Sequence, residues 1–207
     1  MGRGLREQQR RALPAIDRWA GYAAAFWAAA FGIRSLYWAL GGTVGLGTIS
    51  EGLQAAAAAR DPGVLAALWW VTVMLAVGTV LGLALVRAWG AVFPRVLPGV
   101  GGQAVPPAFL LLPSCGAGAL LAAHGGQYLS FLVTVDPLEG EAWWYGVVWG
   151  PWFALGGILF LLASWSYLRR RGGGTLAVVA SFLGVAGGLL AAFAPQIIGL
   201  LVGAFVG

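Results

Sequence analysis

The sequence predicts an all-α integral membrane protein built as a bundle of five transmembrane helices. Of its 207 residues, 60% are hydrophobic and 9% are charged. A soluble globular domain carries about 25% charged residues, so this composition indicates a chain that folds in lipid. Five mainly apolar segments also reach the ~20 residues that a helix needs to cross the hydrocarbon core of a bilayer.

The five predicted helices follow one another without room for a separate soluble domain. They lie at residues 19–42, 64–88, 106–132, 143–167 and 175–206. We therefore expect a basic cytoplasmic N-terminal segment at 1–18 and a single transmembrane domain at 19–207. The fifth segment would measure about 48 Å as a straight helix, against a hydrocarbon core of about 30 Å. Pro195 is expected to kink or break this last helix.

The distribution of arginine predicts how the chain lies in the cell membrane. One set of helix ends carries ten arginines, which are Arg3, Arg6, Arg10, Arg11, Arg18, Arg87, Arg95, Arg169, Arg170 and Arg171. The opposite ends carry a single arginine, Arg60, together with most of the acidic residues. Because arginines in short loops remain in the cytoplasm, we expect a cytoplasmic N-terminus and an external C-terminus. The long first apolar segment disfavours a cleaved signal peptide.

Composition also excludes several classes of function. The arginines form short clusters between apolar segments and make no continuous basic surface, so no nucleic-acid partner is expected. The lone Cys115 allows no intramolecular disulfide. With one histidine and one cysteine, the chain alone does not supply a zinc, haem or iron–sulfur site. We therefore expect neither a metal nor a cofactor.

Arg34 is the most unusual residue of the sequence, because it is the only charged residue between Trp19 and Ser50. An arginine at the centre of a membrane span costs roughly 2.5–3.5 kcal/mol. Its side chain can extend to the outer headgroups, or it can lie inside the bundle beside an acidic partner. Glu51 and the acidic loop at 136–141 are the candidate partners.

Polar and aromatic side chains gather in the external halves of the first, third and fourth helices. Three groups have helical spacing, namely Arg34, Tyr37 and Trp38; His124, Gln127 and Tyr128; and Tyr145, Trp149 and Trp152. Residues three and four apart share one face of a helix. We expect the three faces to line one cavity that opens outward or sideways into the outer leaflet. The alternative is that the aromatic residues form an interfacial belt.

Such a cavity suggests chemistry on carbocations. Aromatic faces stabilise cations, and an acid in an apolar setting can donate a proton. The sequence therefore predicts a membrane-embedded cyclase for a lipophilic prenyl or terpenoid substrate. The expected catalytic residues are Glu51, Asp136, Glu139, Glu141 and His124. The expected substrate-binding residues are Arg34, Tyr37, Trp38, Gln127, Tyr128, Trp149 and Trp152.

Two stretches add a resemblance. LYWALGGTVGL at 36–46 and PWFALGGILFLLASWSYLRRR at 151–171 look like small actinobacterial multi-pass membrane proteins. The size, helix count and tryptophan content also resemble the integral-membrane terpene cyclases of indole-terpenoid pathways. This resemblance implies a prenylated indole or its epoxide as substrate, and ring closure started by an acid. It is a general profile over most of the chain and assigns no residue a role.

Two other functions stay open. In a non-enzymatic membrane subunit or lipid-binding module, paired glycines would let helices approach closely and aromatic residues would anchor the chain at the interface. A small oligomeric transporter is suggested by the similar YWALGG and WFALGG at 37–42 and 152–157, which an inverted repeat would produce. The expected partners are a lipophilic small molecule and membrane lipids, with a homo-oligomer as an open alternative.

Overall fold

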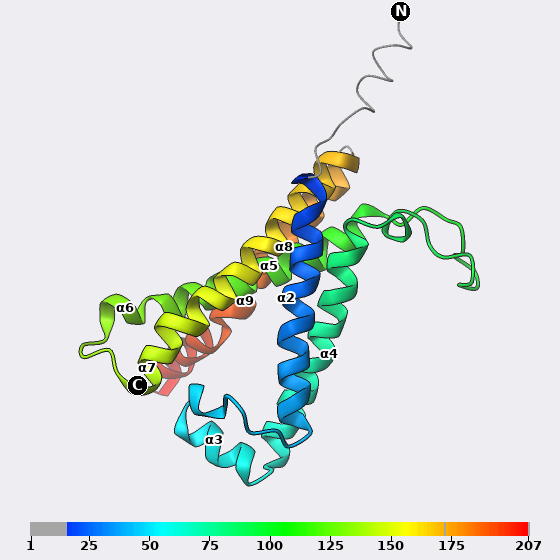
Figure 1. Ribbon diagram of the computed structural model, residues 1–207. Coiled ribbons are helices and arrows are strands. Elements are labelled where there is room, and N and C mark those ends of the chain that lie inside the picture. Colours follow the sequence, from blue (N-terminus) through cyan, green and yellow to red (C-terminus); the bar gives the residue numbers. More distant parts are fainter. Residues whose placement is uncertain (1–15, 172, 207) are drawn as a thin grey trace, which may run out of the picture.

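A computed structural model describes residues 16–171 and 173–206, and within these ranges the chain is helical (Figure 1). The expected segment 1–18 lies almost wholly outside the described residues. Where the chain is described, the only β-type pairing is an isolated bridge between Val92 and Ala104, so the all-α class is confirmed. The five long helices are α2 (Ile16–Ala39), α4 (Pro62–Ala84), α5 (Pro107–Leu129), α8 (Gly150–Arg171) and α9 (Thr175–Val206).

Short helices connect or extend the long ones. They are η1 (Leu46–Thr48), α3 (Glu51–Ala58), η2 (Ala88–Gly90), α6 (Phe131–Thr134), α7 (Gly140–Trp143) and the π-helix η3 (Trp144–Trp149). The last two run directly into α8, and α6 follows α5 within one helical segment, Pro107–Thr134. The fourth predicted helix is therefore longer at both ends than the sequence indicates.

In the described part of the chain, four helical segments are long and apolar enough to cross a membrane. They are Pro62–Ala84, Pro107–Thr134, Gly140–Arg171 and Thr175–Gly199. Helix α2 occupies the first predicted segment and is as long as α4, but it does not belong to this group. Arg34, three tryptophans, two tyrosines and two glycines lower its mean hydropathy.

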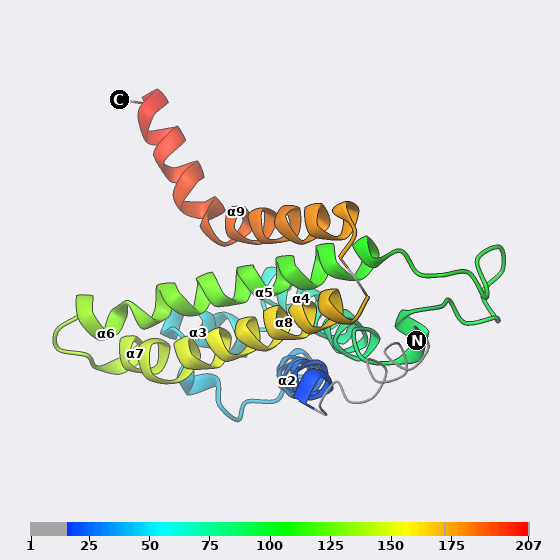
Figure 2. The same ribbon diagram turned by 90° about the horizontal axis from the view of Figure 1, so that it is seen from above.

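The order of the helices in space differs from their order in the chain. Helix α5 lies between α8 and α9, while α2 packs against both α8 and α4. Figure 2 shows α9, α5, α8 and α2 as successive layers. Figure 1 shows the α2–α4 pair crossing the α5, α8 and α9 group, with α3 at the end where the two groups diverge.

Close helix contacts form at glycines. A Cβ atom added to Gly157 of α8 would collide with the backbone of Ala122 on α5. One added to Gly188 of α9 would collide with the backbone of Gly116 on α5. Small residues allow this approach of backbones in lipid, which is the packing role expected for the paired glycines. Buried hydroxyl groups of Ser114 and Ser164, 2.7 Å apart, add a polar contact between α5 and α8.

Helix α9 continues through Pro195 and changes direction part-way along its length (Figure 2), so the expected kink is confirmed. Proline has no N–H to donate and its ring crowds the preceding turn. The amide of Gln127 on α5 donates a hydrogen bond of 3.1 Å to the carbonyl oxygen of Ala192, one turn before the proline. A neighbouring side chain thus bonds a backbone group at the bend, as membrane helices require.

Candidate functional site

The guanidinium of Arg34 lies in a cage of aromatic rings. Its central carbon is 3.5 Å from the ring centre of Trp38, 4.3 Å from that of Trp149 and 5.0 Å from that of Phe31. Trp38 and Phe31 are buried residues of α2, and Trp149 ends the π-helix η3. Arg34 therefore packs against side chains of the bundle, which favours the inward orientation over an extension to the headgroups.

The acidic partner expected for Arg34 is not found in the described part of the chain. There, Arg34 makes neither an ion pair nor a hydrogen bond, and its contacts are the three rings. An aromatic face attracts a cation through its quadrupole, by roughly 0.5–2 kcal/mol depending on desolvation. Cation–π contacts therefore stabilise the guanidinium of Arg34 in place of the expected carboxylate.

Hydrogen bonds from the same aromatic residues hold the cage in place. The indole of Trp38 donates to the carbonyl oxygen of Val44 at 2.8 Å, and that of Trp149 donates to the carbonyl oxygen of Thr48 at 2.7 Å. The backbone N–H of Ser50 donates to the hydroxyl of Tyr145 at 3.1 Å. These bonds tie the connection at 40–50 to α2 and η3, and they leave the faces of the two indoles for Arg34.

Arg34 also lines two cavities. The first, which we call the α3 cavity, measures about 240 Å³ and lies among α2, η1, α3 and α4. The second, the α8 cavity, measures about 290 Å³ and lies between α2 and the η3–α8 segment. Arg34 is the only charged residue in either lining, and Ser35 is the only other polar aliphatic one. Each cavity therefore offers apolar walls with one cationic group.

A second aromatic group joins the cage to α5. His124 lies 4.5 Å from Tyr128 and 4.9 Å from Phe153, measured between ring centres, and Tyr128 lies 4.7 Å from Tyr145. Phe153 in turn lies 5.4 Å from Phe31 of the cage. The three predicted faces therefore meet, but as packed rings, and no residue of α5 lines the two cavities.

Sequence reasoning missed Phe31 and Phe153, the two residues that connect these groups. Each lies one helical turn from a predicted site residue, since Phe31 precedes Arg34 by three positions and Phe153 follows Trp149 by four. That spacing is a usable signal. Among aromatic residues, the predicted faces contain only those that carry a polar atom, and phenylalanine has none.

Three predicted residues have other neighbours than expected. Tyr37 is 43% exposed, and its hydroxyl accepts a hydrogen bond from the backbone of Val44 at 3.4 Å. The side chain of Gln127 donates its hydrogen bond to the backbone of α9, away from the cavities. Trp152 does line the α8 cavity, but its indole N–H is buried without a hydrogen-bond partner within the described ranges.

The predicted acids do not reach the cavities. Glu51, Asp136, Glu139 and Glu141 are all exposed, and none of them lines the α3 or α8 cavity. Asp61 caps α4, where its carboxylate accepts hydrogen bonds from the N–H groups of Gly63 and Val64. Among the residues that the structure describes, no three His, Cys, Asp or Glu side chains gather as a metal site.

The fold and this site define a class, a small helical membrane protein with a caged arginine between apolar cavities. The model of the family described as protein of unknown function (DUF3995) matches residues 28–160, which is more than half of the chain. The chain belongs to this family. The matched region contains the whole Arg34 cage and all of α3, α4 and α5. No curated protein and no solved structure matches the chain.

Proposed function

We propose that this protein binds a lipophilic, chain-shaped small molecule within the cell membrane. The observation that carries this proposal is the position of Arg34, which is held by three aromatic rings in the walls of two otherwise apolar cavities. This function corresponds to the lipid-binding module among the sequence-based alternatives.

The chemistry of the site suggests the kind of ligand. A cation within the membrane is expensive even when aromatic faces offset part of the cost. An anionic or hydrogen-bond-accepting group on a ligand would supply the partner that no acidic residue of the described chain provides. The apolar walls of the cavities suit a hydrocarbon or isoprenoid tail. A tail-bearing molecule with one accepting group matches both features.

The proposal includes α2 as a fifth spanning helix. Its 24 residues would extend about 36 Å as a helix, enough to cross the hydrocarbon core. It packs between α4 and α8, two of the four segments that are apolar enough to span. With Arg18 and Arg171 at the cytoplasmic side, the C-terminus is external. Alkaline phosphatase fused to the C-terminus should then be active, and inactivity would contradict this orientation.

Photolabelling tests the binding site. Membranes containing the full chain are irradiated with diazirine-bearing farnesol or diazirine-bearing stearic acid, and labelled peptides are identified by mass spectrometry. Labels are expected on the residues of α2, α3 and α4 that line the α3 cavity. The Ala57→Leu variant fills this cavity and should reduce labelling there. Ala58→Leu is the matched control, because Ala58 is the exposed neighbour on the same helix.

Two results would contradict the binding proposal. One is equal labelling of the Ala57→Leu and Ala58→Leu variants, since only the first changes the cavity. The other is unchanged labelling of an Arg34→Gln variant by stearic acid, whose carboxylate should depend on the guanidinium. Farnesol carries only a hydroxyl group, so its labelling should decrease less in the Arg34→Gln variant.

A second candidate function is the cyclisation of a prenyl or terpenoid substrate. It is favoured by the continuous aromatic network that runs from Trp149 through Phe31 and Phe153 to Tyr128, because such faces stabilise carbocations. An acid would protonate an epoxide oxygen or an alkene, and loss of a proton would quench the cation, so that substrate and product are isomers. Glu51 is the acid nearest in sequence to a cavity-lining residue, Leu53.

This second candidate is tested with a prenylated indole epoxide. Membranes containing the chain should convert it into an isomer of the same mass and a different retention time. The Glu51→Gln variant is expected to lose this activity, whereas Asp61→Asn, which affects a helix cap, should lose stability before activity. Full turnover in the amide variants of Glu51, Asp136, Glu139 and Glu141 would exclude an acidic side chain of this group as the proton donor.

A further inference from the structure

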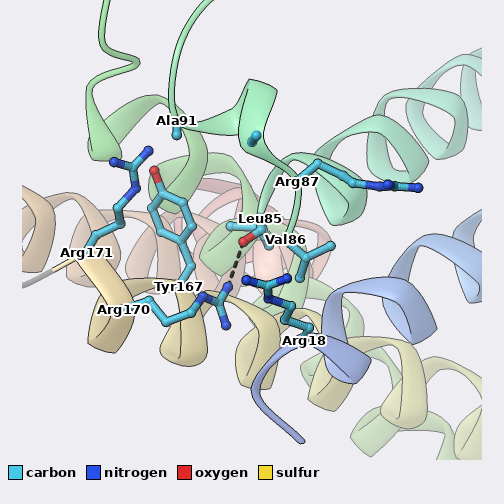
Figure 3. Close-up of a pocket in the computed structure, with 9 residues that line it drawn as sticks. Arg18, Leu85, Val86, Arg87, Ala91, Tyr167, Arg170 and Arg171 are labelled. Carbon is cyan, nitrogen blue, oxygen red and sulfur yellow. Dashed lines mark hydrogen bonds between the residues drawn. The ribbon is translucent and has the colours of Figure 1, made fainter. Parts of the chain in front are cut away.

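A separate cavity lies at the arginine-rich end of the helices (Figure 3). It measures about 270 Å³ and forms where the start of α2, the segment after α4 and the end of α8 meet. Four of its nine lining residues are arginines, and none is acidic; the arginines are Arg18, Arg87, Arg170 and Arg171. We call it the arginine cavity.

The surrounding structure holds these arginines in different ways. Arg170 donates a hydrogen bond of 2.7 Å to the carbonyl oxygen of Leu85, the residue that caps the C-terminal end of α4. The guanidinium carbon of Arg171 lies 5.8 Å from the ring centre of Tyr167, whose side chain is 3% exposed. The guanidinium carbon of Arg87 lies 5.5 Å from the ring of Tyr22.

Figure 3 shows how the charges are oriented. Arg18 and Arg170 extend into the same region below Leu85, Arg171 stands beside the hydroxyl end of Tyr167, and Arg87 points away from the others. Three guanidinium groups from α2 and α8 therefore surround the cavity. Arg170 is bonded to the end of α4, so the groups best placed for a ligand are those of Arg18 and Arg171.

Like charges repel, so guanidinium groups that line one cavity gain stability from an anion bound in it. Guanidinium is planar and pairs with phosphate oxygens through two parallel hydrogen bonds. Basic pockets between membrane helices on the cytoplasmic side suit phosphate-bearing headgroups. The hydroxyl of Tyr167, which donates a long hydrogen bond of 3.5 Å to the carbonyl oxygen of Gly90, adds a further polar atom to the lining. A phosphate group has the charge and the acceptor oxygens that these residues can bind.

We propose that the arginine cavity is a phosphate-binding site, separate from the Arg34 site and independent of the function proposed for it. Arg18 and Arg171 bind the phosphate oxygens, and Arg170 joins the site to the end of α4. The phosphate belongs to the headgroup of an acidic phospholipid or to a soluble phosphate compound. The chemistry of recognition is the same for both sources.

Binding of fluorescent phosphatidic acid tests the site. The full chain is purified in a neutral detergent, and the affinity is measured by fluorescence anisotropy. The Arg18→Gln/Arg171→Gln variant should bind about 25-fold more weakly, because each arginine near an anionic group contributes roughly a factor of five. The matched control is Arg95→Gln/Arg169→Gln, which removes the same charge from the same end outside the cavity lining. Its affinity should remain near that of the unaltered chain.

Two outcomes would overturn the proposal. Equal weakening in both double variants would mean that only the general positive charge of this end attracts the lipid. Unchanged binding in the Arg18→Gln/Arg171→Gln variant would mean that the cavity is not used. If this variant fails to fold, Arg18→Lys/Arg171→Lys replaces it. Lysine keeps the charge but loses the paired hydrogen bonds, so a clear decrease in affinity is still expected, and none would contradict the proposal.

Competition identifies the source of the phosphate. Displacement of the fluorescent lipid by millimolar inorganic pyrophosphate from the unaltered chain, and not from the glutamine variant, would support a soluble phosphate ligand. Displacement by unlabelled phosphatidic acid but not by pyrophosphate would support a lipid headgroup. Failure of unlabelled phosphatidic acid to compete would overturn the proposal, because the fluorescent lipid would then bind without a saturable site.

Discussion

A double-mutant cycle between Arg34 and Trp149 tests the central contact of the site. The two residues lie 115 positions apart in the chain, and the guanidinium carbon stands 4.3 Å from the indole centre. Arg34→Met removes the charge while keeping much of the aliphatic volume. Trp149→Leu removes the aromatic face. If the face stabilises the cation, the two substitutions together should cost less than the sum of their separate costs.

The expected coupling follows from this geometry. Arg34 is only partly exposed and has no charged partner within the described chain, so its attraction to one indole face should be about 1–2 kcal/mol. Trp149→Leu also loses the hydrogen bond to Thr48, worth about 1 kcal/mol, and some packing. Both of those losses occur with or without Arg34, so they cancel in the cycle.

The free energy of unfolding is measured by titrating the purified chain with sodium dodecyl sulfate in mixed micelles. A control cycle pairs Arg34→Met with Trp70→Leu, because Trp70 is an exposed tryptophan on α4. The control coupling should be near zero, whereas the Trp149 cycle should give about 1–2 kcal/mol. A value below about 0.5 kcal/mol for Trp149 lies within ordinary additivity and would refute the cation–π explanation of the cage.

The same titration checks two further predictions, and hydrogen exchange checks a third. Gly156→Ala should lower the free energy of unfolding by about 1–3 kcal/mol, because the added methyl group meets the ring of Trp27. Gly126→Ala should leave the free energy of unfolding nearly unchanged, because its added methyl group meets no neighbouring atom. Equal losses in the two variants would contradict the close-packing explanation. Trp27→Phe should cost about 1 kcal/mol through its lost bond to a backbone carbonyl on α8. Trp152→Phe should cost less, since its N–H has no partner in the described chain, and the reverse order would be evidence against this account. Gln127→Leu should increase hydrogen exchange near the bend of α9, and unchanged exchange would mean that its bond there contributes little.

The sequence was sufficient for the features that depend on local chemistry. Each long helix occupies one of the five predicted apolar segments, because lipid requires backbone groups to be bonded within the segment. Pro195 bends α9 because proline has no N–H to donate and its ring crowds the preceding turn of the helix. Gly125, Gly157 and Gly188 let helix backbones approach closely, as expected, whereas Gly41 and Gly42 lie in the turn after α2.

The aromatic cage depended on long-range geometry that spacing does not encode. The first helix ends at Ala39 rather than at residue 42, so Tyr37 lies on its last turn and packs against the following connection. The π-helix η3 changes the rotation of the chain before α8, so Tyr145 meets Tyr128 of α5 while Trp149 meets Arg34. Periodicity arguments assume a regular α-helix, and both departures lie inside the predicted faces.

The position of α5 between α8 and α9 determines the order in which the protein can assemble. Helices α2 and α4 precede α5 in the chain and pack against each other, so they can pair before α8 is made. The main neighbours of α5 are α8 and α9, which are synthesised after it. The hydroxyl of Ser114 can therefore form its hydrogen bond with Ser164 only after α8 has been made. Packing between helices follows their insertion, so α5 must first be stable alone in lipid. The α2–α4 pair therefore needs no later helix, whereas the three-helix unit around α5 can form only after α8 and α9 have been made.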